Sequence, residues 1–372
     1  MEFGLFSNGF RPHTTAAQTY EEDLFEIALA DELGFRDAWI SEHHGEPVYI
    51  DKIDTIPIPE LMMCKAAAMT KRIRFGPAVK IIHLYHPVDT AQLAAITDHL
   101  TGGRYRFGFG SGVPNALFSQ ERGLTFEDRY PRMLEALDLI RKCWTEPKPF
   151  DWEGKYWQAK GVTALPKPLQ QSLPIGVATL TDDTIAMAGR RGYTMLSAGF
   201  DTPAALRGKA DKYARAALAA GHKTPLDKLS VACFIYVADS VQQAMDDLRP
   251  AVNFELGYQK TRGLLKWVMA PYNVTKPVED LTFDDLVELG VYNVGDPDTV
   301  YDKLRSFYDH SGGFGTLLLF AGKDWATRAK RERSMRLFAQ EVAPRLAPLT
   351  ADREVEPSPV AAGEGTPLLV RP

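Results

Sequence analysis

The segment DAWISEHHGEPV, residues 37–48, places several ionisable side chains directly after a short apolar run. The run predicts a buried strand over residues 38–40, and Ser41, Glu42, His43 and His44 follow at its carboxyl end. Burying polar groups without partners costs about 1–3 kcal/mol each, whereas the carboxyl ends of parallel strands are where α/β proteins build their sites. We therefore interpret the group as a functional Glu-His-His cluster at the mouth of a pocket. The alternative is a set of histidines that only hydrogen-bond to their neighbours.

The elements that must position this group alternate between short apolar runs and longer helical patterns. Strands are predicted at residues 3–6, 38–40, 73–82, 105–109, 175–178, 193–197, 231–237 and 316–320. A helical pattern follows each strand, and its apolar stripe is clearest over residues 129–144. No GxGxxG motif follows the first strand, and the run GFGSG from Gly108 lacks the spacing of a dinucleotide site. Eight such units predict an α/β protein with a single (β/α)8 TIM barrel rather than a doubly wound sheet.

Three segments depart from this alternation. Residues 145–174 carry aromatic side chains around Gly154 and predict a small hairpin insertion after the fourth helix. Residues 255–296 contain Gly257, Gly263 and Pro271 and predict a long irregular loop after the seventh strand, which would act as a lid over the barrel. Residues 347–372 are rich in Pro, Gly, Glu and Ala and predict a disordered tail. We therefore expect one barrel domain over residues 1–346.

The composition excludes several classes of protein. The net charge is −5 and no dense basic cluster is present, so we expect no nucleic-acid partner. No run of about 18 apolar residues exists, and we expect no membrane span. The three cysteines, Cys64, Cys143 and Cys233, form no CxxC pair and predict buried free thiols rather than a metal site. The first residues lack a basic region followed by a long apolar stretch, so the expected compartment is the cytoplasm.

Several motifs, taken in order, resemble the bacterial luciferase-like, flavin-dependent monooxygenase family. They are SEHHG at 41–45, YHP at 85–87, DHLTGGRYRFGFGSG at 98–112, RYPRMLEALDLIRKCW at 129–144, FDWEGKYW at 150–157, LPKPLQQSLPIGVA at 165–178 and VGDPDTV at 294–300. The resemblance covers about residues 1–346, and the branch most resembled is that of the terpene and diketone monooxygenases.

This resemblance implies a (β/α)8 barrel that binds reduced FMN at the carboxyl ends of its strands. A separate flavin reductase would supply the reduced flavin, and O2 would add at the flavin C4a to give a peroxide. That peroxide would insert one oxygen into an apolar ketone, terpenoid or aromatic substrate. The expected assembly is a homodimer. The alternatives are an F420-dependent oxidoreductase of the same fold and a non-catalytic flavin-binding subunit.

The resemblance also assigns roles to the Glu-His-His group. His43 matches the first histidine of the family's pair beside the flavin, where it would handle the proton or only hydrogen-bond to the flavin ring. His44 would orient the loop. Glu42 would fix the tautomer of a nearby histidine or form a buried pair with an arginine.

Cofactor contacts are expected at the ends of three further strands. Ala78 and Val79 stand where some members of the family have a non-proline cis peptide, although an ordinary trans strand is the alternative. Flavin and phosphate contacts, or a simple turn, are expected at Gly110, Ser111 and Gly112. Luciferase has an arginine at the position of Ser111, so the cation for the phosphate is missing there. Hydroxyl and amide groups for an anion are expected at Thr179, Leu180, Thr181 and Thr184, with helix capping by Thr181 or Asp182 as the alternative. Arg190 or Arg191 is a candidate for the missing cation.

An apolar substrate would need aromatic and aliphatic side chains on the loops around the flavin. The candidate substrate residues are Phe10, His13, Tyr49, Tyr85, Phe118, Trp267, Met269 and Tyr272. Ordinary packing is the alternative for each of them.

Overall fold

The computed structural model describes residues 1–44, 56–112, 125–179, 181–197, 199–261 and 263–350, except the side chains of Phe126, Leu264 and Trp267. Eight parallel strands form its centre. In order around the barrel they are β1 (Glu2–Phe10), β2 (Asp37–Ile40), β3 (Arg74–Pro77), β4 (Phe107–Phe109), β7 (Ile175–Ala178), β8 (Thr194–Ser197), β9 (Leu229–Val237) and β11 (Thr316–Lys323). β1 pairs with β11, and isolated bridges join Phe75 to Tyr105 and Lys80 to Phe109 between β3 and β4. The predicted (β/α)8 barrel is therefore confirmed.

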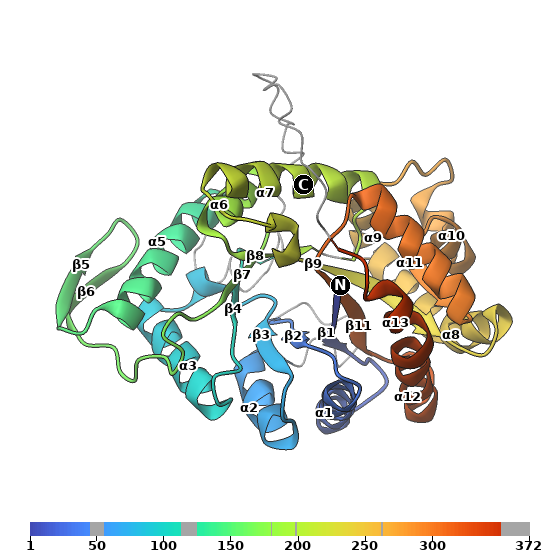
Figure 1. Ribbon diagram of the computed structural model, residues 1–372, viewed down its shortest axis with the longest axis horizontal. Helices are drawn as coiled ribbons and strands as arrows, with labels where there is room; N and C mark the ends of the chain where they lie inside the picture. Colours follow the sequence, from blue (N-terminus) through green and yellow to red (C-terminus); the bar gives the residue numbers. More distant parts are fainter. Residues whose placement is uncertain (45–55, 113–124, 180, 198, 262, 351–372) are drawn as a thin grey trace.

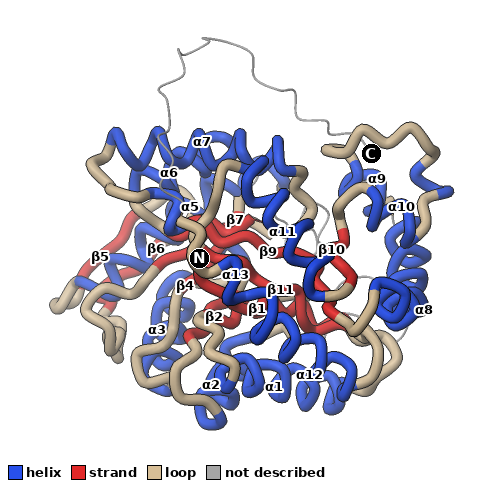
Figure 2. Tube along the Cα trace, turned by 45° about the vertical axis from the view of Figure 1, so that its right-hand side comes forward, coloured by secondary structure: helices blue, strands red, loops and turns tan. Residues whose placement is uncertain are grey.

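Helices surround this barrel on its outside (Figures 1 and 2). They are α1 (Ala16–Glu32), α2 (Pro59–Met69), α3 (Pro87–Leu100), α5 (Phe126–Thr145), α6 (Asp182–Arg191), α7 (Pro203–Ala219), α8 (Val241–Thr261), α9 (Leu264–Met269), α10 (Phe283–Glu288), α11 (Pro297–Ser311), α12 (Arg328–Leu337) and α13 (Ala343–Leu346). Shorter turns lie at η1 (Ile82–Leu84), η2 (Pro225–Lys228), η3 (Val278–Asp280) and η4 (Phe338–Val342). Side chains that cap helix amino termini, such as Thr15, Thr125 and Asp296, explain where α1, α5 and α11 begin. No helix in the described ranges has the length and apolar character needed to cross a membrane.

Trp39 fills the interior of the barrel. Its ring is 1% exposed, and the neighbouring strands make room for it with glycines. A Cβ added at Gly76 would come within 2.4 Å of the ring, and one at Gly108 within 2.8 Å. The barrel is therefore a packed core rather than a pore, and polar side chains at its ends are held at fixed positions.

The hairpin insertion is confirmed as β5 (Phe150–Glu153) and β6 (Gln158–Val162), which pair antiparallel and project from the side of the barrel (Figure 1). The Glu135 carboxylate of α5 anchors the hairpin turn by accepting hydrogen bonds from the amides of Tyr156 and Trp157.

The predicted long loop at residues 255–296 is wrong. That segment contains the last turns of α8, the helices α9 and α10, and β10 (Tyr292–Gly295), which pairs in parallel with the carboxyl half of β9. These elements are only four to six residues long apart from α8, so their periodicity is too brief to recognise between Gly263 and Pro277.

The predicted strand at 73–82 is also too long. β3 ends at Pro77, the Ala78–Val79 peptide is cis, and residues 82–84 form the turn η1. Pro77 has no amide hydrogen to continue a ladder, although the Ala78 amide still donates to the carbonyl of Ile40 at 2.8 Å. β3 therefore ends where β2 also ends, although Lys80 still pairs with Phe109 of β4 through an isolated bridge.

Candidate active site

A buried polar cluster lies where β2 and β3 end, and Glu42 is at its centre. Glu42 is 4% exposed. One of its oxygens lies 2.8 Å from Nε2 of His44 and accepts a hydrogen bond from the Tyr85 hydroxyl at 3.1 Å. The other oxygen lies 2.7 Å from Nζ of Lys80, which is also 3.6 Å from Glu60. The predicted partnership of Glu42 with a histidine is thus observed, whereas its second partner is a lysine and not an arginine.

The pKa values of the two carboxyl groups in this cluster, Glu42 and Glu60, are shifted in opposite directions. Burial by itself would raise the pKa of Glu42, but the hydrogen bond from His44 and the charge of Lys80 hold that pKa below its usual value. Burial raises the pKa of Glu60, and the nearby charge of Glu42 adds to this, with Lys80 opposing both. Because its pKa is lowered, Glu42 keeps its negative charge at neutral pH.

His44 and Tyr85 extend the cluster towards the end of the barrel. The Tyr85 oxygen lies 2.6 Å from Nε2 of His44, so the hydroxyl, the imidazole and Glu42 are within hydrogen-bond distance of one another. The half-buried His43 is next to them in sequence, and its amide donates to the carbonyl of Ile56 at 3.3 Å. Tyr85, predicted to contact substrate, thus also belongs to the polar cluster. The arrangement can hold a proton on an imidazole at a fixed position.

Small residues lie beside this cluster at the end of β4. A Cβ added at Gly110 would come within 2.6 Å of the Val79 side chain and 3.3 Å of the Ala178 carbonyl. Gly112 has a φ of +67°, which favours glycine. Gly110 is therefore needed for the close approach of the chain after β3, β4 and β7, and Gly112 for its positive φ, whether or not a ligand also lies there.

The cation near Ser111 comes from α5, which the sequence analysis did not identify as part of the site. Nη1 of Arg129 lies 3.4 Å from the Ser111 carbonyl, and the arginine is 8% exposed. Burial lowers the pKa of Arg129, with Glu127 opposing the shift. A basic residue in the first turn of the helix after β4 was the signal available in the sequence. Arg191, by contrast, pairs with Asp138 at the far end of α6, so the guess that it supplies this cation is wrong.

Three threonines follow β7 next to the glycines of β4. The Thr181 and Thr184 hydroxyls lie 2.8 Å apart, and the Thr181 amide donates to the Thr179 hydroxyl at 3.3 Å. Thr181 precedes α6 without making a side-chain cap bond to it. Because β4 and β7 are neighbours, the structure brings Thr179 and Gly110 to the same edge of the barrel. Leu180 lies outside the described residues.

The predicted substrate residues that the structure describes lie in separate groups, with Phe10 and His13 at the end of β1. The Phe10 ring lies 5.7 Å from that of Tyr258, and the His13 ring lies 4.6 Å from that of Phe254, both in α8. Met269 is 2% exposed and packs in a second apolar cluster, against which Tyr272 also packs. The structure does not describe Tyr49, Phe118 or the side chain of Trp267.

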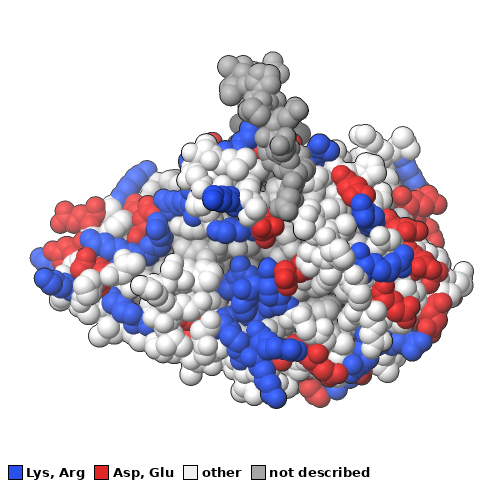
Figure 3. All heavy atoms as spheres, viewed as in Figure 1, with Lys and Arg blue, Asp and Glu red and all other residues white. Residues whose placement is uncertain are grey.

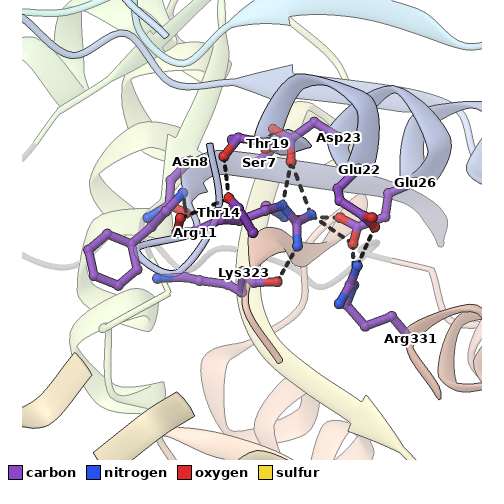
Figure 4. A network of polar contacts seen from close by, with 12 residues as sticks. Ser7, Asn8, Arg11, Thr14, Thr19, Glu22, Asp23, Glu26, Lys323 and Arg331 are labelled. Carbon is purple, nitrogen blue, oxygen red and sulfur yellow. Dashed lines mark hydrogen bonds and ion pairs between the residues drawn. The ribbon is translucent and has the colours of Figure 1, made fainter. Parts of the chain in front are cut away.

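Three buried ion pairs lie near the ends of β1 and β11, and no pattern in the sequence pointed to them. Arg11 is fully enclosed between Asp23, at 3.0 Å, and Glu26, at 2.8 Å, and it donates to the backbone carbonyl of Lys323 (Figure 4). The ammonium of Lys323 pairs with Glu255 of α8 and lies 5.0 Å from the centre of the Phe10 ring. These pairs fix the ends of β1 and β11 to α1 and α8.

No group of three or more His, Cys, Asp or Glu side chains within the described ranges is arranged to hold a metal ion. Cys64, Cys143 and Cys233 are free thiols, although Cys64 is only partly buried. The site therefore offers proton-handling groups, a cation, hydroxyls and an apolar wall.

Comparison with known proteins identifies the family. Residues 1–313 match the family described as luciferase-like monooxygenase. The chain is 31% identical over 356 residues to 4-hydroxyprotoasukamycin monooxygenase of Streptomyces nodosus subsp. asukaensis, covering 93% of this chain and 92% of that protein. A similar solved structure is the oxygenating constituent of 3,6-diketocamphane monooxygenase from Pseudomonas putida, a type II Baeyer-Villiger monooxygenase in complex with FMN. It superposes with a TM-score of 0.80 at 28% identity, and the match covers 93% of this chain and 98% of that one.

An F420-dependent secondary alcohol dehydrogenase has a TM-score of 0.71 at 20% identity, covering 95% of this chain and 99% of that one, and at that identity shows only a shared fold. The matches to the monooxygenases, by contrast, extend over nearly all of both chains. The chain therefore belongs to the luciferase-like monooxygenase family and is a monooxygenase built on that family's barrel.

Proposed function

We propose that this chain is the oxygenase component of a two-component, FMNH2-dependent monooxygenase that acts on an apolar ketone, terpenoid or aromatic compound. The observation that supports it best is the meeting, at one end of the barrel, of the Glu42–His44–Tyr85 cluster, the glycine-lined ends of β3 and β4, and the apolar group around Phe10. The similar 3,6-diketocamphane enzyme, described as an oxygenating constituent with FMN, supports both the cofactor and a separate flavin reductase.

The residues present fit a flavin mononucleotide. Gly110 and Gly112 put no side chain on the backbone that follows β4, where the family's flavin site is expected. The buried guanidinium of Arg129 and the hydroxyls of Thr181 and Thr184 provide a cation and donors for a phosphate. Reduced FMN, when bound, supplies the two electrons that activate O2.

The chain's own residues would then position substrate and proton. His43 would give or take the proton at the reacting centre, and Glu42 and Tyr85 would keep the His44 imidazole oriented beside it. Phe10, Met269 and Tyr272 would exclude water from the apolar side. We also propose a homodimer in the cytoplasm.

Anaerobic titration with reduced FMN, reduced riboflavin and reduced F420 tests this proposal. FMN should bind at least about tenfold tighter than riboflavin, because charge-assisted bonds to the phosphate are worth about 1.5–3 kcal/mol. The variant Arg129→Gln should reduce that difference, whereas Arg345→Gln, an exposed arginine paired with Asp298, should not. Binding of F420 alone would overturn the proposal and favour the F420-dependent alternative.

The role of His43 is tested by turnover. His43→Ala should lower turnover with FMNH2, O2 and a cyclic ketone by about 10²-fold or more while FMN affinity changes little, because a positioned acid or base contributes about 10²–10⁴-fold. His310→Ala, at an exposed histidine of α11, is the matched control. Undiminished turnover in His43→Ala would assign the proton to another group.

A further inference from the structure

A large basic cavity opens at the opposite end of the barrel, where the strands begin. It has a volume of 810 Å³, and five arginines and two lysines line it, against one acidic side chain, Asp227. Lys and Arg gather in the middle of this face, over the region of β2 to β4 (Figure 3). Since the whole chain carries a net charge of −5, this positive charge is a local feature.

One wall of the cavity has more positive charge than its buried carboxylate neutralises. Arg36, Arg74 and Arg106 precede or begin β2, β3 and β4, and each lies 2.9 Å from a carboxylate oxygen of Asp37. Burial lowers the pKa of Arg106, opposed by Asp37 and reinforced by Arg74 and Arg36. Three guanidinium groups around one carboxylate leave a net charge that an anion would stabilise.

Beyond Arg191, which pairs with Asp138, the cavity lining also has two lysines whose bonds go to neutral oxygens. Nζ of Lys167 donates to the carbonyls of Cys143 and Glu146, both at 2.6 Å, and Nζ of Lys228 donates to the Gly192 carbonyl at 2.7 Å. These backbone carbonyls satisfy the hydrogen-bond donors of the two lysines but carry no charge, so the positive charge of each lysine is not neutralised. An arginine network that only stabilised the ends of the strands would not need these lysines.

The cavity also has a neutral side. Ser230 is 1% exposed, and its hydroxyl has no hydrogen-bond partner among the described residues, although it lines the cavity. Trp144, Leu173 and Ile175 add apolar side chains to the lining of the cavity. Pockets of about 300–1,000 Å³ hold small organic ligands, and an aromatic ring packs well against such a surface.

From these features we propose that the amino-terminal end of the barrel binds a phosphorylated small molecule of nucleotide size. Its phosphates lie among the arginines and its ring lies against Trp144. The flavin residues are at the carboxyl ends of the same strands, so the two ligands occupy separate sites.

Isothermal titration of the full chain with ATP, tripolyphosphate and adenosine tests the proposal. ATP should bind one to one, tripolyphosphate about tenfold more weakly and adenosine not measurably, and saturating FMN should leave ATP binding unchanged. The double variant Arg141→Gln/Lys228→Gln removes two exposed cavity cations without touching Asp37, and it should weaken ATP at least tenfold. The control Arg249→Gln/Arg305→Gln, with the same charge change on surface pairs, should change it less than twofold.

Several results would overturn the proposal. They are the absence of ATP binding, competition between ATP and FMN, equal weakening in the control variant, and equal affinity for ATP and tripolyphosphate. Binding of ATP only after removal of residues 351–372 would also overturn it, because the chain's own end would then be the occupant.

Discussion

Lys80 places its charge between two buried carboxyl groups, those of Glu42 and Glu60, and is itself 1% exposed. Removing one partner from a buried ion pair leaves an uncompensated charge, which costs about 3–5 kcal/mol. We therefore expect Lys80→Met to lower the free energy of unfolding by about that amount, as measured by urea denaturation at pH 7.

The matched control is Lys212→Met, which breaks the exposed pair with Asp182 and should cost at most about 1 kcal/mol. If Lys80→Met were no more destabilising than this control, Glu42 and Glu60 would both be neutral or hydrated in the folded state.

His83 should make stability depend on pH. It is fully buried, and neither ring nitrogen has a hydrogen-bond partner in the described part of the chain. Burial, aided by Arg129 and Arg132 and opposed by Glu42, lowers the pKa of His83 to about 4. Between pH 6.5 and about 4, the unfolded histidine binds a proton that the folded one does not, so stability falls as the pH falls.

The loss attributable to His83 reaches about 3 kcal/mol at the acid end of this window. The variant His83→Leu should not show this loss. Its free energy of unfolding should therefore fall less between pH 7 and pH 5 than that of the unsubstituted chain. The same dependence in both proteins would show that other groups cause the loss.

At the scale of elements, α9 is part of the packed structure rather than a free lid. Leu265, Val268 and Met269 are at most 7% exposed and belong to the second apolar cluster. Truncating a buried methionine to alanine costs about 2–5 kcal/mol, so Met269→Ala should be destabilising by that amount in chemical denaturation.

Met69→Ala provides the comparison, because Met69 is 53% exposed at the end of α2 and should change stability by less than about 0.5 kcal/mol. An equally small effect of Met269→Ala would restore the earlier interpretation of this segment as a loosely attached cover.

At the scale of the whole molecule, residues 347–350 form hydrogen bonds beside the start of β1. The amino-terminal ammonium of Met1 donates to the carbonyls of Ala347 and Leu349, at 2.7 and 2.8 Å, and the Tyr308 hydroxyl donates to that of Thr350. We propose that the folded domain extends to Thr350 rather than 346.

A chain ending at Thr350 should unfold with the same free energy as the full chain. A chain ending at Leu346 should lose about 1–3 kcal/mol of unfolding free energy, because it lacks the Ala347 and Leu349 carbonyls that accept hydrogen bonds from the Met1 ammonium. Equal stability of the two truncated chains would return the domain boundary to residue 346.

The sequence alone determined the architecture and the main polar cluster. Eight apolar runs of strand length, separated by helical patterns, predict the barrel because each run is buried on both faces. The Glu-His-His group was recognisable because its side chains are too polar for a core and follow such a run. The aromatic residues around Gly154 likewise predicted the hairpin.

Only the tertiary structure decided which residues meet. Lys80 looked like one polar residue within a strand, and its partners Glu42 and Glu60 come from β2 and α2. Arg129 lies in a helix but reaches the end of β4. β10 and α9 are too short for their periodicity to be recognised, and they form through contacts with β9 and α8. Local patterns specify elements, whereas partners distant in the sequence depend on how the barrel closes, which no local pattern encodes.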